Sequence, residues 1–319
     1  MTTYKEVKGT NIEAVVSDPS NPVEGQIWFN TATGLAKGTF NDPGSWATGG
    51  ALNTARTELA GSGTQTAGLA FGGTNPDTNK TEAYGGTTWT EVNNLNTARA
   101  NLAGAGTQTS ALAFGGTPPG VLAITELWNG TNWTEVNDLN TARQKIGGVG
   151  ASNTAALAFA GALGPGSASA LTETWNGTNW TEVNDLNTAR KRLAGAGIIT
   201  AALAFGGEVP PGTAVTELFN GTNWTEVNDL NTARLALAGS GTSTAALAFG
   251  GTTPPNSALT EFWNGTNWTE VNDLNTARSY LAGAGTQTSA LGFGGDSGSL
   301  TAATEEWNVG LNTVTFTEA

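Results

Sequence analysis

The sequence contains no cysteine and no histidine, and only 13 of its 319 residues are lysine or arginine. Without cysteine the chain forms no disulfide and offers neither a thiolate nucleophile nor a thiolate metal site. Without histidine it has no imidazole base and no histidine-bound metal. We therefore expect no metal and no cofactor, and catalytic mechanisms that need these side chains are excluded.

Cations are outnumbered by anions, and long apolar runs are missing. The formal net charge of −13 argues against a nucleic-acid partner and against adhesion to an anionic bilayer. No apolar stretch approaches the roughly 18 residues that span a membrane. The opening "MTTYKEVKGTNIEAVVSDP" lacks the apolar centre of a signal peptide. We expect neither membrane insertion nor classical secretion.

One segment, "LNTAR", is present six times. Its arginines are 43 to 47 residues apart and stand at positions 56, 99, 143, 190, 234 and 278. A constant period of this size indicates stacked or closed structural repeats. We number the units 1 to 6 from these arginines.

Each unit has the pattern of four short strands. In unit 2 these are expected at residues 99–106, 110–116, 124–130 and 132–136. Asn129-Gly130 is a strong hairpin turn between the last two, because both residues tolerate positive φ. The glycines and alanines of the first strand suit a crowded position near an axis. No 3.6-residue apolar period is present, so negligible helix is expected.

The order of these features resembles the kelch repeat of β-propellers. The "ALAFGG" double glycine is followed by an aromatic residue on the next strand, a tryptophan after a hairpin, and an arginine that opens the next unit. The resemblance covers residues 52–319. It implies an all-β, six-bladed kelch-like β-propeller with four antiparallel strands per blade. The Trp-Asp type of propeller is less suitable, since no Gly-His or Trp-Asp pair marks the units.

The strand that closes the ring is not decided by the sequence. Residues 44–56, "GSWATGGALNTAR", resemble a fourth strand placed before unit 1, yet "NTVTFTEA" at the end of the chain has the same character. A hairpin is expected within residues 26–40. We assign residues 1–45 to an extended N-terminal docking segment, which is also a candidate source of the closing strand. Residues 46–319 are assigned to the propeller.

The repeated residues are interpreted as structural. Each "LNTAR" arginine is expected to pair with a glutamate of the third strand such as Glu126, with the glutamate of a "TEV" segment, or with loop carbonyls. The alternative is a ring of six guanidinium groups that binds an anion on the axis. Glu135 and its equivalents are expected to be partners or solvated edges. The tryptophans are expected to be buried between blades rather than to stack on sugars: Trp133, Trp180, Trp224 and Trp268. An active site is normally single, so acids copied around a ring do not favour an enzyme.

The residues that differ between units concentrate in two places. These are the loop between the second and third strands and the pair after each arginine, which alternating strand direction places on one face. Such variation on a rigid base is typical of recognition surfaces; free drift of exposed positions after duplication is the alternative. The candidate binding residues are Glu58, Asn101, Gln144, Lys145, Lys191, Arg192 and Tyr280 after the arginines, and Asp77, Pro118, Pro210 and Pro254 in the loops. Lys145, Lys191 and Arg192 form a basic cluster in units 3 and 4, suited to an anionic host glycan or an acidic protein surface.

The N-terminal part carries a second resemblance. "SNPVEGQIWFNTATG", followed by "NGTNWTEV" and "LNTAR" arrays, resembles structural proteins of marine bacteriophages. The resemblance implies a non-enzymatic virion protein, tail-fibre or adhesin-like, assembled in the host cytoplasm and present as an oligomer in the particle. The N-terminal segment would contact other virion proteins, and the propeller would recognise the host surface. A decoration protein without a receptor role, a glycan-degrading propeller enzyme and a bacterial surface lectin are the alternatives.

Overall fold

The computed structural model describes residues 12–316, except residues 24, 42, 75–77 and 165. Two compact units are present: a large one of residues 45–308, and a small one formed by residues 1–44 together with 309–319. The described residues contain strands and no helix, as expected. None of them therefore forms a helix long and apolar enough to cross a membrane.

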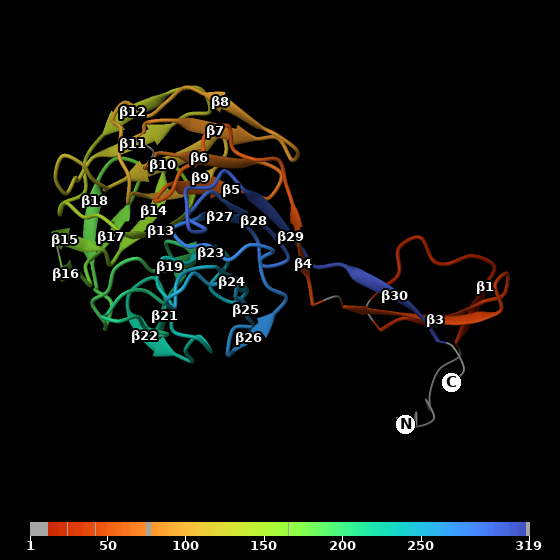
Figure 1. The fold of residues 1–319 in the computed structure, drawn as a ribbon. Helices are drawn as coiled ribbons and strands as arrows, with labels where there is room; N and C mark the ends of the chain where they lie inside the picture. Colours follow the sequence, from red (N-terminus) through yellow and green to blue (C-terminus); the bar gives the residue numbers. More distant parts are fainter. Residues whose placement is uncertain (1–11, 24, 42, 75–77, 165, 317–319) are drawn as a thin grey trace. The chain divides into compact units, whose positions relative to one another are not determined.

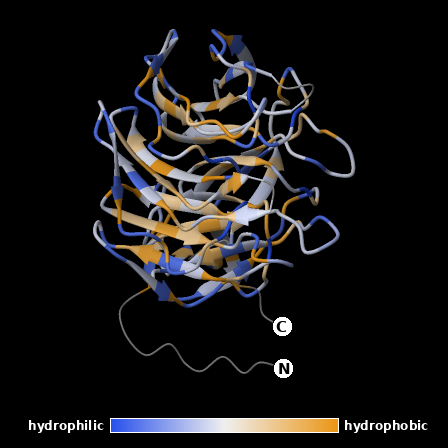
Figure 2. Ribbon diagram, turned by 90° about the vertical axis from the view of Figure 1, so that its left-hand side faces the viewer, coloured by the Kyte–Doolittle hydropathy of each residue, from blue (hydrophilic) through white to orange (hydrophobic). Residues whose placement is uncertain are grey.

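The large unit is a six-bladed propeller of four-stranded antiparallel sheets (Figure 1). In blades 1 to 5 the strands lie side by side in chain order; in blade 6 the order is β27, β28, β29 and β4. The strands that lie innermost, against a central channel, are β5, β9, β13, β19, β23 and β27. These inner strands consist mainly of alanine and glycine, which permits six of them to crowd around one axis. Hydrophobic residues concentrate in the strands and hydrophilic residues in the connections (Figure 2).

The blades have closely similar bounds. Blade 1 consists of β5 (Ala60–Gly63), β6 (Gly68–Phe71), β7 (Thr81–Tyr84) and β8 (Trp89–Val92), and blade 2 of β9 (Ala103–Thr107), β10 (Ser110–Phe114), β11 (Thr125–Trp128) and β12 (Trp133–Val136). Blade 3 consists of β13 (Gly147–Ser152), β14 (Ala155–Phe159), β17 (Thr172–Trp175) and β18 (Trp180–Val183), and blade 4 of β19 (Ala194–Ile198), β20 (Ala201–Phe205), β21 (Thr216–Phe219) and β22 (Trp224–Val227). Blade 5 consists of β23 (Ala238–Gly241), β24 (Ala246–Phe249), β25 (Thr260–Trp263) and β26 (Trp268–Val271), and blade 6 of β27 (Ala282–Gly285), β28 (Ser289–Phe293), β29 (Thr304–Asn308) and β4 (Ser45–Thr48). The loop of blade 3 adds a two-stranded sheet of β15 (Ala162–Gly164) and β16 (Ser167–Ala168).

The ring is closed by the N-terminal side of the chain. Strand β4 pairs with β29 as the fourth strand of blade 6, with Trp46 opposite Trp307. The competing strand β30 (Leu311–Phe316) pairs instead with β3 (Leu35–Asn41) in the small unit. The expected propeller boundary at residue 319 is therefore wrong. The propeller ends at Asn308, because the edge of β29 is already occupied by β4.

The blades are held together by a tryptophan at or next to the start of each fourth strand. Trp133 is 5% exposed, and its Nε1–H donates to Thr81 Oγ1 of blade 1 at 3.0 Å. Its ring lies 5.0 Å from that of Phe71 in blade 1 and 5.3 Å from that of Trp128 in its own blade. The same indole-to-threonine bond joins every neighbouring pair of blades: Trp180–Thr125, Trp224–Thr172, Trp268–Thr216, Trp46–Thr260 and Trp89–Thr304. The prediction that these tryptophans are buried between blades is confirmed.

The small unit is a four-stranded sheet rather than an extended segment. Strand β1 (Glu13–Val15) runs parallel to β2 (Ile27–Asn30), β2 and β3 form the expected hairpin, and β30 completes the sheet. Asp18 links these strands because its carboxylate accepts hydrogen bonds from Trp28 Nε1 and Asn30 Nδ2, at 3.0 and 2.7 Å, and pairs with Lys37 Nζ at 2.6 Å. The bond from Lys37, then those from Asn30 and Trp28, lower the pKa of Asp18 from 3.8 to about 2.

We predict that truncating one inter-blade tryptophan destabilises the whole ring. Trp133→Ala removes a buried aromatic side chain and an interblade hydrogen bond, and should lower the free energy of unfolding by about 3–5 kcal/mol. Denaturant titration followed by circular dichroism measures this loss. Thr134→Ser, at the adjacent exposed position, is the control and should change it by less than about 0.5 kcal/mol. Equal stability of the two variants would contradict the packing role.

We also predict an acid-dependent change in the small unit. Since the folded-state pKa of Asp18 is depressed, the stabilisation from its contacts is complete above the ordinary pKa of 3.8 and is lost as the pH falls through about 2. The Nε1–H resonance of Trp28 in NMR spectra should shift with a midpoint near pH 2. In Asp18→Asn this titration should be absent, and its persistence there would contradict the assignment.

Candidate functional site

Six buried ion pairs fix the position of the "LNTAR" segments, each of which is followed by the variable pair of residues. Arg143 and Glu173 of blade 3 are an example: the guanidinium is fully buried, and its Nη2 lies 2.7 Å from Glu173 Oε1. Its Nη1 donates to the carbonyls of Leu171 and Ala160, at 2.6 and 3.1 Å. The other carboxylate oxygen accepts from the backbone N–H and the Nδ2 of Asn140, at 2.7 and 2.8 Å. One glutamate thus binds both the asparagine and the arginine of "LNTAR".

The same pairing recurs in each blade. Burial lowers the pKa of every one of these arginines, and the paired glutamate acts in the opposite direction. The pairs are Arg56–Glu82, Arg99–Glu126, Arg143–Glu173, Arg190–Glu217, Arg234–Glu261 and Arg278–Glu305. The structural interpretation of the arginines is confirmed. A guanidinium ring on the axis is wrong, because all six side chains lie inside the blades.

The two variable regions lie on one face, as expected. The first residue after each arginine forms a β-bridge with the residue that follows the double glycine, as Lys191 does with Glu208. Gly207 has φ of +113°, and a Cβ there would lie 3.0 Å from the Lys191 carbonyl, so glycine permits this approach. The loops and the strand starts therefore share the face at one end of the channel.

The second residue after each arginine forms a closed ring around the channel mouth. All six have φ between 53° and 56°, in the left-handed region; they are Glu58, Asn101, Lys145, Arg192, Ala236 and Tyr280, and we call them the mouth ring. Each backbone N–H donates to the carbonyl of its counterpart in the preceding blade, and Glu58 closes the circle on Tyr280 at 3.1 Å. Each of these N–H and C=O groups thus has a backbone partner, and the six positions differ in their side chains alone.

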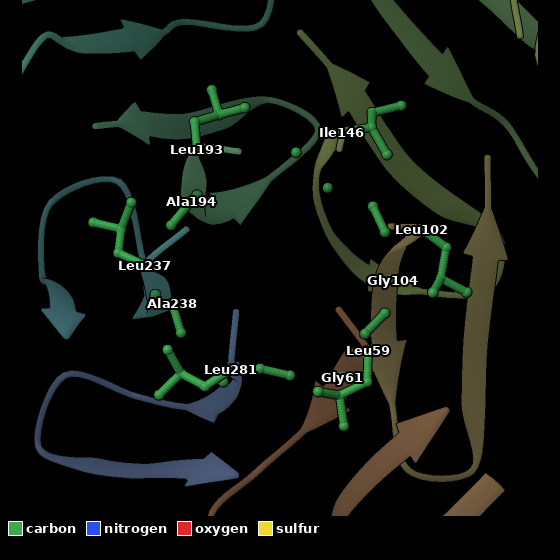
Figure 3. Close-up of a pocket in the computed structure, with 18 residues that line it drawn as sticks. Leu59, Gly61, Leu102, Gly104, Ile146, Leu193, Ala194, Leu237, Ala238 and Leu281 are labelled. Atoms are coloured by element: carbon green, nitrogen blue, oxygen red, sulfur yellow. The ribbon is translucent and has the colours of Figure 1, made fainter. Parts of the chain in front are cut away.

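Aliphatic side chains form a floor beneath the mouth ring. They follow its members directly in sequence and surround the axis in Figure 3: Leu59, Leu102, Ile146, Leu193, Leu237 and Leu281. All six are buried. Floor and ring together enclose a cup of about 110 Å³, and below it the channel continues between alanines and glycines.

The structure brings together five of the candidate residues and separates the others. Glu58, Asn101, Lys145, Arg192 and Tyr280 line the cup. Gln144 and Lys191 occupy the bridged positions beside it, and their backbones pair with Ala162 and Glu208. The loop prolines lie outside its lining, with Pro118 half-buried and with Pro210 and Pro254 exposed; Asp77 lies outside the described residues. Ala236 and the floor were not among the candidates, although an aliphatic residue follows every variable pair in the sequence.

Two of the three cations in the expected basic cluster already have an acidic partner. Glu208 pairs with Lys191 Nζ at 3.4 Å and with Arg192 Nη1 at 2.8 Å. Lys191 is buried at 7% exposure, and the Arg192 guanidinium lies 5.2 Å from the centre of the Tyr280 ring. The three cations of the predicted cluster thus differ in charge environment, because Glu208 of the adjacent loop pairs with two of them.

Glu58 and Lys145 have different surroundings. Glu58 accepts hydrogen bonds from Asn101 Nδ2 at 2.9 Å and from Thr74 Oγ1 at 3.1 Å. The Lys145 ammonium has no ion pair or hydrogen bond with any residue that the structure describes. Burial lowers the pKa of Lys145, and the nearby charges of Arg192 and Lys191 lower it further. The cup thus holds an unpaired cation at one position and a restrained acid at another.

Comparison with known proteins supports the fold. No family model matches the chain, and no curated protein matches its sequence. The solved structure described as "Structure of YjhT", a kelch-repeat β-propeller protein, superposes with a TM-score of 0.64 over 83% of this chain and 99% of that chain, at 11% identity. The chain has a six-bladed, kelch-like β-propeller fold. At this level of identity the similarity concerns the fold alone.

We predict that breaking one buried ion pair costs far more than changing the acid beside it. Glu126→Gln leaves the buried Arg99 without a counter-charge and should reduce the free energy of unfolding by about 3–5 kcal/mol. Glu135 lies opposite Glu126 in the neighbouring strand but is exposed. Glu135→Gln should therefore change stability by no more than about 0.5 kcal/mol. Chemical denaturation of both variants provides the test, and similar losses would contradict the structural role of the pair.

Proposed function

We propose that this protein is a non-enzymatic structural protein of a bacteriophage particle, and that its propeller binds the host surface through the mouth ring. The observation behind the binding role is that the six equivalent positions of the ring carry six different side chains. They include an acid, an amide, two cations, an alanine and a tyrosine. The floor directly beneath is uniformly aliphatic. Chemical variety in a concave site on a rigid base is the usual organisation of a recognition surface.

Binding without catalysis is favoured by the state of the acids at the mouth. Glu58 is held by Asn101 and Thr74, and Glu208 is neutralised by Lys191 and Arg192. Glycosidases need two carboxylates placed on either side of a scissile bond, one as an acid and the other as a nucleophile or base. Because both acids have structural partners, we favour an adhesin over a glycan-degrading enzyme.

The small unit is the proposed attachment to the particle. The phage-like segment "SNPVEGQIWFNTATG" contributes β2 and the turn after it. Strand register places Phe29, Ala36 and Phe316 in one row on one sheet face, and Ile27 and Val314 beside them. Phe29 and Val314 are 40% and 44% exposed. An exposed apolar sheet face suits a complementary apolar surface on another virion protein.

The host-binding part is tested with labelled full-length protein. Because the chain has no cysteine, Glu135→Cys on an outer strand accepts a single fluorophore away from the mouth. Flow cytometry then measures attachment to a panel of marine bacterial isolates. The mouth variant Asn101→Gly/Tyr280→Gly removes two side chains while glycine keeps the positive φ without strain. It should bind at least about tenfold more weakly, a loss of roughly 1.4 kcal/mol.

The matched control changes the opposite face. Thr131→Ala/Thr178→Ala alters two exposed residues in turns between third and fourth strands, and should bind as the parent does. Attachment of the mouth variant at parental strength would overturn the recognition role. Antibodies against the chain should label purified phage particles in electron microscopy; particles that lack the chain would overturn the virion role.

The attachment role is tested separately by Phe29→Glu/Val314→Glu in the full chain. Charges on the apolar face should prevent incorporation into particles while leaving attachment of the free protein to cells unchanged, since the mouth is untouched. Immunoblots of purified particles measure incorporation. Normal incorporation would show that this face does not contact the particle.

A further inference from the structure

The cup lacks one counter-ion. Lys145 is a mouth-ring residue whose ammonium has no acidic partner among the described residues. The two carboxylates that act on it electrostatically, Glu58 and Glu208, are already engaged by other side chains. The cations Arg192 and Lys191 add positive potential from the next blade and oppose its charge. An anion from outside the chain would therefore be stabilised at this point.

The surrounding charges restrict that anion to a single negative group. Glu58 and Glu208 lie near the same lysine, and the chain as a whole carries a formal charge of −13. A densely acidic protein surface would bring several carboxylates against these acids and would be repelled. A ligand with one isolated carboxylate avoids this repulsion.

The remaining groups favour a sugar as the carrier of that carboxylate. Glu58 and the Tyr280 hydroxyl offer acceptor atoms, for which sugar hydroxyl groups are suitable donors and aspartate or glutamate side chains are not. The cup is small, at about 110 Å³, and a single sugar residue suits it better than a whole oligosaccharide.

We propose that the channel mouth binds a uronic-acid residue of a surface polysaccharide, with its carboxylate on the Lys145 ammonium and its hydroxyl groups on Glu58 and Tyr280. This inference rests on the proposed function and names the ligand class of the same site. The interaction is a single charge-assisted contact in a shallow cup, so affinity for one residue is low. Strong attachment then comes from many copies of the chain on one particle.

Isothermal titration calorimetry with an acidic trisaccharide that has one galacturonate between two galactose residues, and with neutral galactotriose at equal concentration, tests the proposal. The parent should bind the acidic trisaccharide, more weakly as salt is added, and should bind the neutral one at least tenfold more weakly. Lys145→Met, which keeps length and removes charge, should lose at least tenfold in affinity, whereas Lys145→Arg should stay within about threefold of the parent. Lys80→Met is the control: Lys80 pairs with Glu91 at 3.1 Å outside the cup and should have no effect. Melting curves confirm that all variants are folded.

The other outcomes decide separately between the ligand class and the host-binding role. Equal binding of the neutral trisaccharide, or full binding by Lys145→Met, would remove the carboxylate contact. Tighter binding of a sulfated galactan trisaccharide, or of an Asp/Glu-rich peptide, would assign the cup to those ligands. If no uronate binds while the parent attaches to cells and the mouth variant does not, the ligand class is wrong but the recognition role stands. If uronate binds as expected and no cell is bound, the ligand class stands and the host-binding role fails.

Discussion

The buried pair of arginine and glutamate inside each blade is the interaction on which the arrangement of this molecule depends. A guanidinium and a carboxylate taken out of water are stable only when nearly all their hydrogen bonds are made. Here "LNTAR" meets most of that requirement by bringing its asparagine and arginine to one glutamate of the third strand, with carbonyl groups as further acceptors, and the arginine Nε–H is left without a hydrogen-bond partner among the described residues. The segment that connects two successive blades is therefore fixed to the blade that it enters. The two residues after the arginine reach the channel mouth as a direct consequence.

The mouth can vary because the contacts repeated between all neighbouring blades are made by other side chains. Blades adhere through tryptophan, phenylalanine and threonine in the interblade layers, and β4 closes the circle by pairing with β29. The circle of hydrogen bonds that runs through all six members of the mouth ring is made by backbone atoms. Its members adopt left-handed backbone conformations, which cost most residues roughly 1–2 kcal/mol each. Such strain is retained where the surrounding structure over-determines it, and it is common at binding sites.

Charge at the mouth is more finely balanced than the residue types indicate. A lysine and an arginine share Glu208, while Glu58 is restrained by neighbours from two blades, its own and the next. Among the described residues this leaves Lys145 without an acidic partner. The site is thus selective through exclusion as well as attraction, because the same acids that restrain the cations repel a ligand with clustered negative charge.

The repeats, and much of the face that carries the variable residues, could be predicted from the sequence. They depend on contacts between residues close together in the chain, and these contacts are repeated six times. The six arginines gave the blade count, Asn129-Gly130 gave the hairpin, and alternating strand direction placed the variable pairs beside the loops. Partner choice between distant segments was decided by the tertiary structure. β4 and β30 have equal strand character, and only the free edge of β29 determines which one closes the ring. Glu208 and Lys191 lie in different segments, and the bridge between them converts an apparently free cation into a buried, paired one. The floor residues and the circle of backbone hydrogen bonds require all six blades at once. A local pattern specifies each blade, whereas a site on the axis exists only after the ring has closed.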